Sequence, residues 1–378
     1  MNILFITPSE VQPLNGGIER ITYSLSQAMS EYYGYACYFR CLNEDCSEAA
    51  MEKYISEKAI DIIIAQGANK RIAQLLPTLR RIIDIAGRKI VLLFVFHSNP
   101  GVELATMDYA VLWNRIIHGQ DLKANLQQLV WQLCQPIISR SMLKHLESKY
   151  RLPYEYADKI VLLSPHFIQE YRAISGGDEA KFTAIPNMLS FSEDIKPVAH
   201  KTKMVLLVSR MEERQKRIKL ALKIWNKVRH NEWQLKIVGV GEDLEYYKCL
   251  TKRWNVKDVS FEGRQNPLPY YQEAPIFMMT SAFEGWGLTL TEAQQCGCVP
   301  IVFDTYASLS DIVEDGRNGF VVPEGNIDEY VARLTLLMDD ASLFQKMAEN
   351  AMIDCQRYTP QKVALRWNTL FNELVKQN

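Results

Sequence analysis

Two glutamates, Glu284 and Glu292, are eight positions apart in the stretch SAFEGWGLTLTEAQQCG, where two glycines interrupt an otherwise apolar run. The preceding run, IFMMTS, predicts a buried strand, so Gly285 and Gly287 fall in a turn between that strand and a helix. Glycines let a backbone approach a ligand closely, and N–H groups at a helix start favour an anionic oxygen. A carboxylate that accepts two hydrogen bonds suits neighbouring hydroxyls on a sugar or ribose. The alternative is that Glu284 only caps the helix and Glu292 is solvated.

A second group of chemically capable residues is cationic. In LLVSRMEERQKRIKLAL, Arg210 follows an apolar run that predicts a strand, and Lys216 comes six residues later beside the next expected helix. Arginine offers a planar fork for two oxygens and lysine a mobile point charge, so the two together suit a diphosphate, including one that departs during a reaction. The other three cations of this stretch are interpreted as solvated helix charges: Arg214, Arg217 and Lys219.

The first half of the chain adds weaker candidates. Gly16 and Gly17, in ITPSEVQPLNGGIER, come between an expected strand and an expected helix, where a phosphate could rest. A Gly-Gly pair is equally the signature of a tight turn. His97, in VFHSNPG, is expected at the carboxyl end of a central strand, which is where ligands bind in parallel sheets. A lone histidine can also be purely structural, so both interpretations stay open.

Composition excludes several classes of protein. The chain has 43 basic and 44 acidic residues among 378, without the basic excess of a dedicated nucleic-acid binder. Its longest apolar run, IVLLFVF, is far shorter than the ~20 residues that span a bilayer, and its start reads as a first strand rather than a signal peptide. Eight scattered cysteines without a CxxC pair, and histidines without a zinc-site spacing, predict reduced thiols, a cytoplasmic location and no zinc site.

Short apolar runs alternate with helical stretches throughout, which predicts an α/β fold with parallel sheets. The alternation occurs twice, with a polar stretch at about 188–202 between the two series. We therefore expect two doubly wound domains, 1–187 and 188–359, with ligands bound at the carboxyl ends of the strands. The last helix, 360–378, is expected to pack back on the first domain.

Basic residues are concentrated in two segments of the first half. Residues 104–151 contain six Lys or Arg against three acids, and residues 69–89 contain six against one. One interpretation is a surface for anionic lipid or a lipid-linked acceptor, with peripheral contact at the inner face of the plasma membrane. The other is ordinary solvated helix faces.

These residues resemble the retaining glycosyltransferases of family four, which have the GT-B fold of two Rossmann-like domains around a cleft. The resemblance covers most of the chain. It includes GGIER, FHS, ADKIVLLS, IPN, SR with Lys216, IVGVGED, the E-x7-E element at Glu284 and Glu292, GCVPIVFDT and EDGRNGFVVPEGN. One departure is Leu288-Thr289-Leu290-Thr291, where the family often has proline or small residues.

The resemblance implies a role for each candidate residue. Glu292 would hold the ribose of a nucleotide sugar, Glu284 the transferred sugar, and the backbone from Gly285 through Trp286 and Gly287 to Leu288 would offer N–H groups. Arg210 and Lys216 would neutralise the leaving diphosphate without a metal, since the sequence has no Asp-x-Asp triplet. Gly16 and Gly17 would contact the diphosphate and His97 the anomeric centre after domain closure. Gly241 and Arg264 would lie near the base.

The resemblance thus implies a hexosyltransferase that moves sugar from a nucleotide sugar to a saccharide or lipid-linked acceptor with retention, in cell-surface polysaccharide biosynthesis. It implies no cofactor and no nucleic-acid partner. Three alternatives remain at this point: a catalytically silent GT-B subunit, a GT-B nucleotide-sugar epimerase, and a nicotinamide-dependent dehydrogenase. The last lacks the GxGxxG fingerprint.

Overall fold

The structure is a computed structural model, and it describes residues 1–12, 17–67, 70–106, 108–117, 122–191, 195, 201–229 and 231–377. Within the helix α5 (Leu122–Tyr156) it does not describe the side chains of residues 135–145, 147 and 148. The chain divides into two compact units. Unit 1 comprises residues 1–101, 139–190 and 357–378, and unit 2 comprises residues 102–138 and 191–356.

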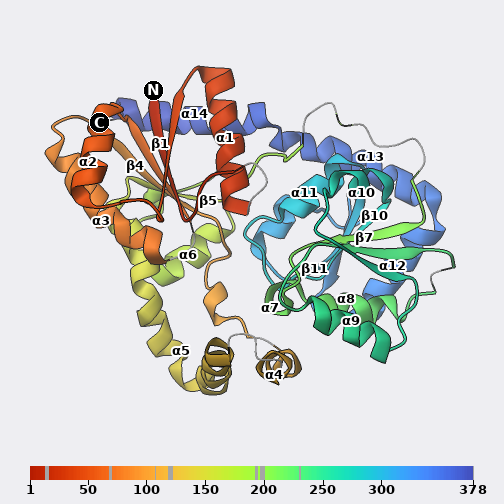
Figure 1. The fold of residues 1–378 in the computed structure, drawn as a ribbon. Helices are drawn as coiled ribbons and strands as arrows, with labels where there is room; N and C mark the ends of the chain where they lie inside the picture. The colour runs from red at the N-terminus through yellow and green to blue at the C-terminus, as the bar shows by residue number, and fades with distance from the viewer. Residues whose placement is uncertain are drawn as a thin grey trace. The chain divides into compact units, whose positions relative to one another are not determined.

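Unit 1 contains a six-stranded parallel sheet in the order β2-β1-β3-β4-β5-β6 (Figure 1). Every residue of the two central strands, β3 and β4, is buried, which explains why their sequences are continuously apolar rather than alternating. The strands are β1 (Asn2–Thr7), β2 (Ala36–Cys41), β3 (Ile62–Gln66), β4 (Val91–Phe96), β5 (Lys159–Leu162) and β6 (Phe182–Ala184). The helices between them are α1 (Gly17–Tyr33), α2 (Glu48–Glu57), α3 (Lys70–Ile85) and α6 (Phe167–Ser175).

Unit 2 contains a second six-stranded parallel sheet, in the order β12-β11-β10-β7-β8-β9. Its strands are β7 (Met204–Val208), β8 (Gln234–Val238), β9 (Val259–Gly263), β10 (Ile276–Met279), β11 (Val299–Asp304) and β12 (Phe320–Pro323). From β7 the chain builds outward through β8 to β9, then returns to β10 on the other side and continues to β12. The carboxyl ends of β7 and β10 therefore form the topological switch point, where open α/β sheets bind ligands.

The helices of unit 2 cover this sheet and include one very short element. They are α7 (Glu213–Lys216), α8 (Ile218–Trp225), α9 (Leu244–Arg253), α10 (Leu268–Glu273), α11 (Leu288–Gln295), α12 (Ile327–Asp339) and α13 (Ala341–Cys355). The predicted fold class is confirmed, because both units contain a parallel sheet whose strands alternate with helices along the chain.

The two units differ from the predicted domains in one segment. Residues 102–138, which include α4 (Tyr109–Ile117) and the start of α5, group with unit 2 rather than with the first domain. Their attachment includes the buried side chain of Arg115, which pairs with Asp243. The last helix, α14 (Pro360–Gln377), packs against α1 in unit 1, where Trp367 and Phe371 join the apolar core (Figure 1).

In the part of the chain that the structure describes, no helix is both long and apolar enough to cross a membrane. The eight cysteines are free, and Cys296 and Cys298 are buried beside α11. Cys298 donates its thiol to the carbonyls of Tyr271 and Ala274, and burial raises its pKa to about 11. These two cysteines are therefore part of the packing of unit 2, as expected for buried thiols.

Candidate functional site

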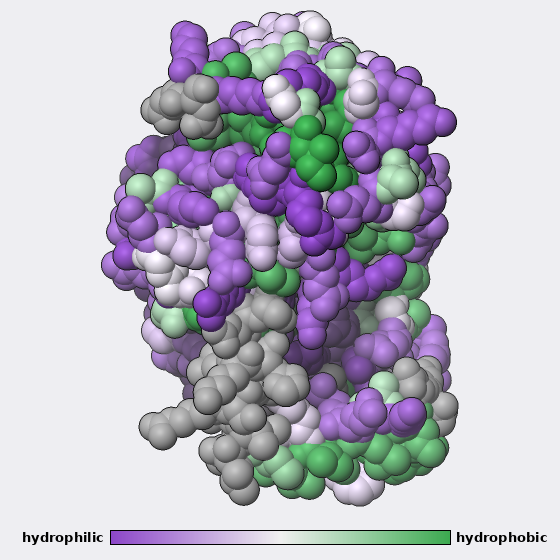
Figure 2. Space-filling model, turned by 90° about the vertical axis from the view of Figure 1, so that its left-hand side faces the viewer, coloured by the Kyte–Doolittle hydropathy of each residue, from purple (hydrophilic) through white to green (hydrophobic). Residues whose placement is uncertain are grey.

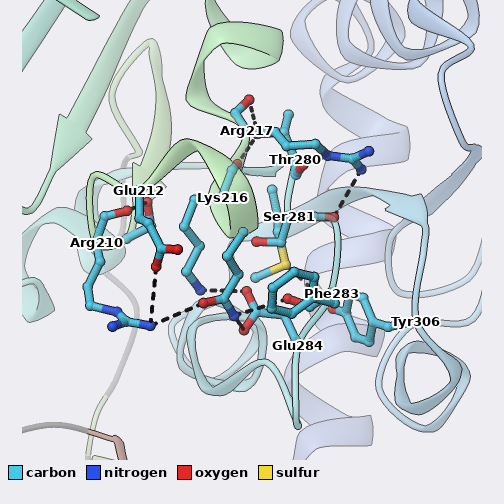
Figure 3. A network of polar contacts seen from close by, with 12 residues as sticks. Arg210, Glu212, Lys216, Arg217, Thr280, Ser281, Phe283, Glu284 and Tyr306 are labelled. Atoms are coloured by element: carbon cyan, nitrogen blue, oxygen red, sulfur yellow. Dashed lines mark hydrogen bonds and ion pairs between the residues drawn. The ribbon is translucent and has the colours of Figure 1, made fainter. Parts of the chain in front are cut away.

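The sequence-predicted cations and glutamates of unit 2 meet at the carboxyl ends of β7 and β10. Lys216 ends the short helix α7, and its Nζ lies 2.6 Å from Oε1 of Glu284, in the loop that follows β10. The side chains of Lys216 and Glu284 are 13% and 10% exposed. Figure 3 shows the two side chains pointing toward each other from these two elements. A pair this buried is strongly coupled, because removing one partner leaves the other charge uncompensated.

A glutamine that the sequence analysis did not single out organises this pair. Gln215 donates its amide to the other oxygen of Glu284 at 3.2 Å and to the carbonyl of Phe283 at 3.1 Å. Its side-chain oxygen accepts from Arg210, and its backbone carbonyl accepts from Ala282 at 2.7 Å. Nothing in its residue type marks Gln215 as functional; its position directly before Lys216 was the only available signal.

Arg210 lies at the open side of this cluster (Figure 3). Its side chain is 72% exposed, and its guanidinium donates to Gln215 at 3.1 Å. Glu212 is 3.9 Å away, a distance at which an exposed pair contributes little. The guanidinium therefore remains accessible to a solvent-borne anion.

The turn before α11 requires glycine at position 287. Gly287 has φ +90° and precedes α11, and a Cβ there would lie 3.3 Å from Leu290 and from the Tyr306 hydroxyl. Trp286 is buried, whereas Gly285 and Leu288 are half-buried. The first N–H groups of a helix have no intrahelical partner, so this turn offers donors beside Glu284.

Glu292 lies one turn into α11 and is only 1% exposed. Its Oε2 accepts a hydrogen bond from the hydroxyl of Tyr271 at 3.0 Å. Tyr271 comes from α10 and was not expected from the sequence. The carboxylate is therefore buried, which excludes the alternative hypothesis that Glu292 is a solvated surface residue.

Arg214, Arg217 and Lys219 were interpreted as solvated helix charges, and that interpretation was wrong, because each side chain has a partner within unit 2. Arg217 adopts a left-handed backbone (φ +49°) and donates to the carbonyls of Thr280 and Ser281 (Figure 3). Lys219 pairs with Asp108 at 2.6 Å, and Arg214 donates to carbonyls of residues 102–105. Arg214 and Arg217 therefore fix α7 and its C-terminal end, which matters because a helix of four residues is not stable alone, and Lys219 fixes the start of α8.

The glycines after β8 pack against the loop that carries Arg210. A Cβ on Gly239 would lie 1.9 Å from the carbonyl oxygen of Ser209, and one on Gly241 would lie 2.5 Å from that of Met211. Gly241 therefore permits a close backbone approach. Arg264, directly after β9, is exposed.

Unit 1 contains the remaining predicted residues. His97 follows β4, and its Nε2 lies 2.6 Å from Oε1 of Gln66. Burial lowers the pKa of His97 to about 4, so the ring is neutral at physiological pH. Gly17 is the first residue of α1, and a Cβ there would meet no atom within 4 Å. Gly16 lies outside the described residues.

Comparison with known proteins agrees with this geometry. Residues 191–353, which include the cluster around Lys216, match the family model of the glycosyl transferases group 1. An uncharacterized glycosyltransferase of Haemophilus influenzae is 28% identical over 247 residues, covering 64% of this chain and 69% of that protein. A poly(glycerol-phosphate) alpha-glucosyltransferase of Bacillus subtilis is 27% identical over 225 residues, covering 58% of this chain but 33% of that longer protein.

The fold of the whole chain is also shared with solved structures. HepE of Anabaena, solved in complex with UDP and glucose, superimposes with a TM-score of 0.71 and covers 99% of this chain and 100% of its own. At 17% identity this likeness establishes the fold and no more. The matched family model, the relatives and the two six-stranded sheets agree with the resemblance seen in the sequence: residues 191–353 match the group 1 glycosyltransferases, and the chain shares its two-sheet fold with HepE.

Proposed function

We propose that this protein transfers a hexose from a nucleoside diphosphate sugar to a saccharide or lipid-linked acceptor, with retention of anomeric configuration, in the synthesis of a cell-surface polysaccharide. The observation that carries the proposal is the buried Lys216–Glu284 pair at the switch point of a group 1 glycosyltransferase domain, with Glu292 in the adjoining helix. The comparisons do not favour a silent binding subunit or an epimerase.

In this proposal each group contacts a different part of the donor. Lys216 and Arg210 neutralise the diphosphate, and the N–H groups of Gly285–Leu288 add donors beside it. Glu284 accepts from hydroxyls of the transferred sugar. Glu292 accepts from ribose hydroxyls, with Tyr271 fixing the direction of its carboxylate.

The chemistry that these residues support needs no enzymic nucleophile. The bond from the anomeric carbon to the diphosphate oxygen breaks, and the acceptor oxygen forms its bond on the same face. The acceptor's proton passes to the departing diphosphate oxygen. Charge accumulates on that oxygen in the transition state, so a fixed cation such as Lys216 lowers the barrier more than it strengthens substrate binding. We propose that these cations serve in place of a divalent metal.

Two relatives suggest which donor to try first. One is named an alpha-glucosyltransferase, and HepE has been solved with UDP-glucose. We therefore propose a UDP-hexose as donor and UDP-glucose as the first probe. An α-linked product from this α-linked donor would establish retention.

We propose that unit 1 binds the acceptor. We also propose that His97 lies near the anomeric centre and that Gly16 and Gly17 contact the diphosphate. The burial of two basic residues weakens the hypothesis that the basic segments bind anionic lipid at the cytoplasmic face of a membrane. Arg115 and Lys149, two of the basic residues of 104–151, are buried and unavailable to lipid. The start of α5 instead exposes Leu122, Leu126, Val130 and Leu133, and hydrophobic residues gather along the lower edge of the view in Figure 2.

A panel of nucleotide sugars tests the proposal. Each is added to the protein, and its release of nucleoside diphosphate and its effect on thermal unfolding are followed. The proposal predicts that one donor both raises the unfolding temperature and is slowly hydrolysed, because a ligand of the native state stabilises it. If no nucleotide sugar does either, the proposal is wrong.

A further inference from the structure

Arg115 links residues 102–138, which we call the inserted segment, to the core of unit 2. It lies in α4, and its guanidinium makes two hydrogen bonds to Asp243, from Nε to Oδ1 at 2.8 Å and from Nη2 to Oδ2 at 2.6 Å. Glu242 lies 2.8 Å from the same guanidinium. The side chains of Arg115 and Asp243 are only 8% and 1% exposed. Paired bonds between planar groups fix orientation as well as distance.

Asp243 passes this constraint to α7. Its Oδ2 also accepts from the backbone N–H of Glu213, the first residue of α7, at 2.8 Å. Its own N–H donates to the carbonyl of Met211 at 3.1 Å. The carboxylate therefore ties the loop after β7 and the start of α7 to the start of α9.

Lys216 is the last residue of this same short helix. Its backbone N–H donates to the carbonyl of Glu212, and Arg217 donates to that of Glu213. A side-chain oxygen of Glu213 accepts from the N–H of Lys219 at 2.9 Å. A displacement of Glu213 would therefore move Lys216 relative to Glu284.

The inserted segment contacts the neighbourhood of α7 at two further points. Arg214 donates to the carbonyls of Val102 and Ala105, at 3.2 Å each, and Lys219 pairs with Asp108. Of these contacts, the Arg115–Asp243 pair is the most enclosed and has the most restrictive geometry.

We propose that Arg115 is a positioning residue for the donor site: through Asp243 and the backbone of Glu213 it holds α7 so that Lys216 faces Glu284. Arg115 itself is separated from the Lys216–Glu284 pair by these intermediates. The inserted segment thereby becomes part of the catalytic machinery of unit 2. The expected effect of Arg115 on the rate of sugar transfer rests on the proposed function, whereas its effect on the position of α7 does not.

The experiment compares Arg115→Met with Arg317→Met in the full chain. Arg317 also makes two hydrogen bonds to one aspartate, Asp354, at 3.0 Å each, but contacts no residue of α7 in the described structure. Amide hydrogen exchange is measured in peptides covering 209–219. Exchange there should accelerate in Arg115→Met and stay unchanged in Arg317→Met, because only the former loses the support of the Glu213 N–H.

Kinetics with the donor found by the nucleotide-sugar panel provide the second measurement. In Arg115→Met, kcat should fall by about one to two powers of ten while KM for the donor changes less, as expected when a reacting group is misplaced. Arg115→Lys, which keeps the charge but not the paired geometry, should recover only part of kcat.

Unchanged exchange in 209–219 of Arg115→Met would overturn the inference, whether or not a donor has been found. Accelerated exchange with an unaltered kcat would also overturn it. Failure of every nucleotide sugar would count against the proposed function alone, because the exchange measurement needs no substrate.

Discussion

Lys216 and Glu284, 68 positions apart in the sequence, form a buried ion pair with Nζ 2.6 Å from Oε1. The family resemblance implies that these residues bind different parts of a donor, Lys216 the diphosphate and Glu284 the sugar. Their contact makes them a single unit in which each charge compensates the other. In the proposed function, Lys216 would bind the diphosphate and Glu284 the sugar hydroxyls, so their contact agrees with a donor in which these two groups are bonded to each other.

Glu284→Gln keeps the shape of the side chain but removes its charge. We expect kcat to fall by about tenfold or more, with a smaller change in the affinity for free nucleoside diphosphate, because the diphosphate lacks the sugar that we propose Glu284 to contact. Steady-state kinetics and calorimetry with UDP measure the two effects. A variant that loses nucleotide affinity but keeps kcat would place Glu284 on the nucleotide instead.

Glu292→Ala should weaken binding of the nucleotide as a whole. A hydrogen bond to a charged acceptor contributes about 1.5–3 kcal/mol, so the dissociation constant for UDP should rise at least about tenfold. Tyr271→Phe, which removes the hydroxyl bonded to Glu292, is the matched control and should have a smaller effect. UDP binding by Glu292→Ala with wild-type affinity would refute the ribose assignment.

His97 should make stability depend on pH on the acid side. Burial lowers the pKa of its folded form to about 4, whereas the unfolded chain has an ordinary value of about 6.5. Between these values the unfolded state binds more protons, so stability falls as the pH falls through this window. In urea unfolding at about pH 7 and about pH 5, His97→Gln should therefore lose less stability than wild type on acidification. Equal pH dependence of His97→Gln and wild type would contradict the lowered pKa.

Two glycines with positive φ provide a test of the loop that carries Arg210. At Gly239, φ is +137° and a Cβ would clash with the Ser209 carbonyl, whereas at Gly263, φ is +72° and a Cβ would meet no atom within 4 Å. Gly263→Ala should cost about 1 kcal/mol, and Gly239→Ala several times more. Thermal unfolding of the two variants measures the difference in stability. Equal losses of stability would show that the backbone at Gly239 does not pack against Ser209 as described.

The periodicity of apolar residues was sufficient to predict both sheets. Strands such as β4 are buried on both faces and therefore read as continuous apolar runs, and parallel pairing follows from the helices between them. The gathering of Arg210, Lys216 and Glu284 at one edge of the sheet could also be predicted, since each lies in the segment that follows the carboxyl end of a strand.

Side-chain partners could not be predicted in the same way. Arg115 and Asp243 belong to different halves of the chain, and nothing in their local sequence distinguishes a buried pair from two solvated charges. The same is true of Arg217, whose bonds to Thr280 and Ser281 depend on the adjacency of β7 and β10. Strand order decides such contacts, and a single sequence does not contain it.

The most direct test of the central claim is the rate of sugar transfer by Lys216→Ala, measured at saturating nucleotide sugar in the presence of a metal chelator. The wild-type enzyme should keep its activity under these conditions. The variant should be slower by about two to three powers of ten, as when one preorganised oxyanion donor is removed, while its affinity for the donor changes less. Glu284→Gln combined with Lys216→Ala should be little slower than Lys216→Ala alone, because the two residues act as a unit. A wild-type rate abolished by chelator and restored by Mg²⁺ or Mn²⁺, or a Lys216→Ala variant as fast as wild type, would contradict the account.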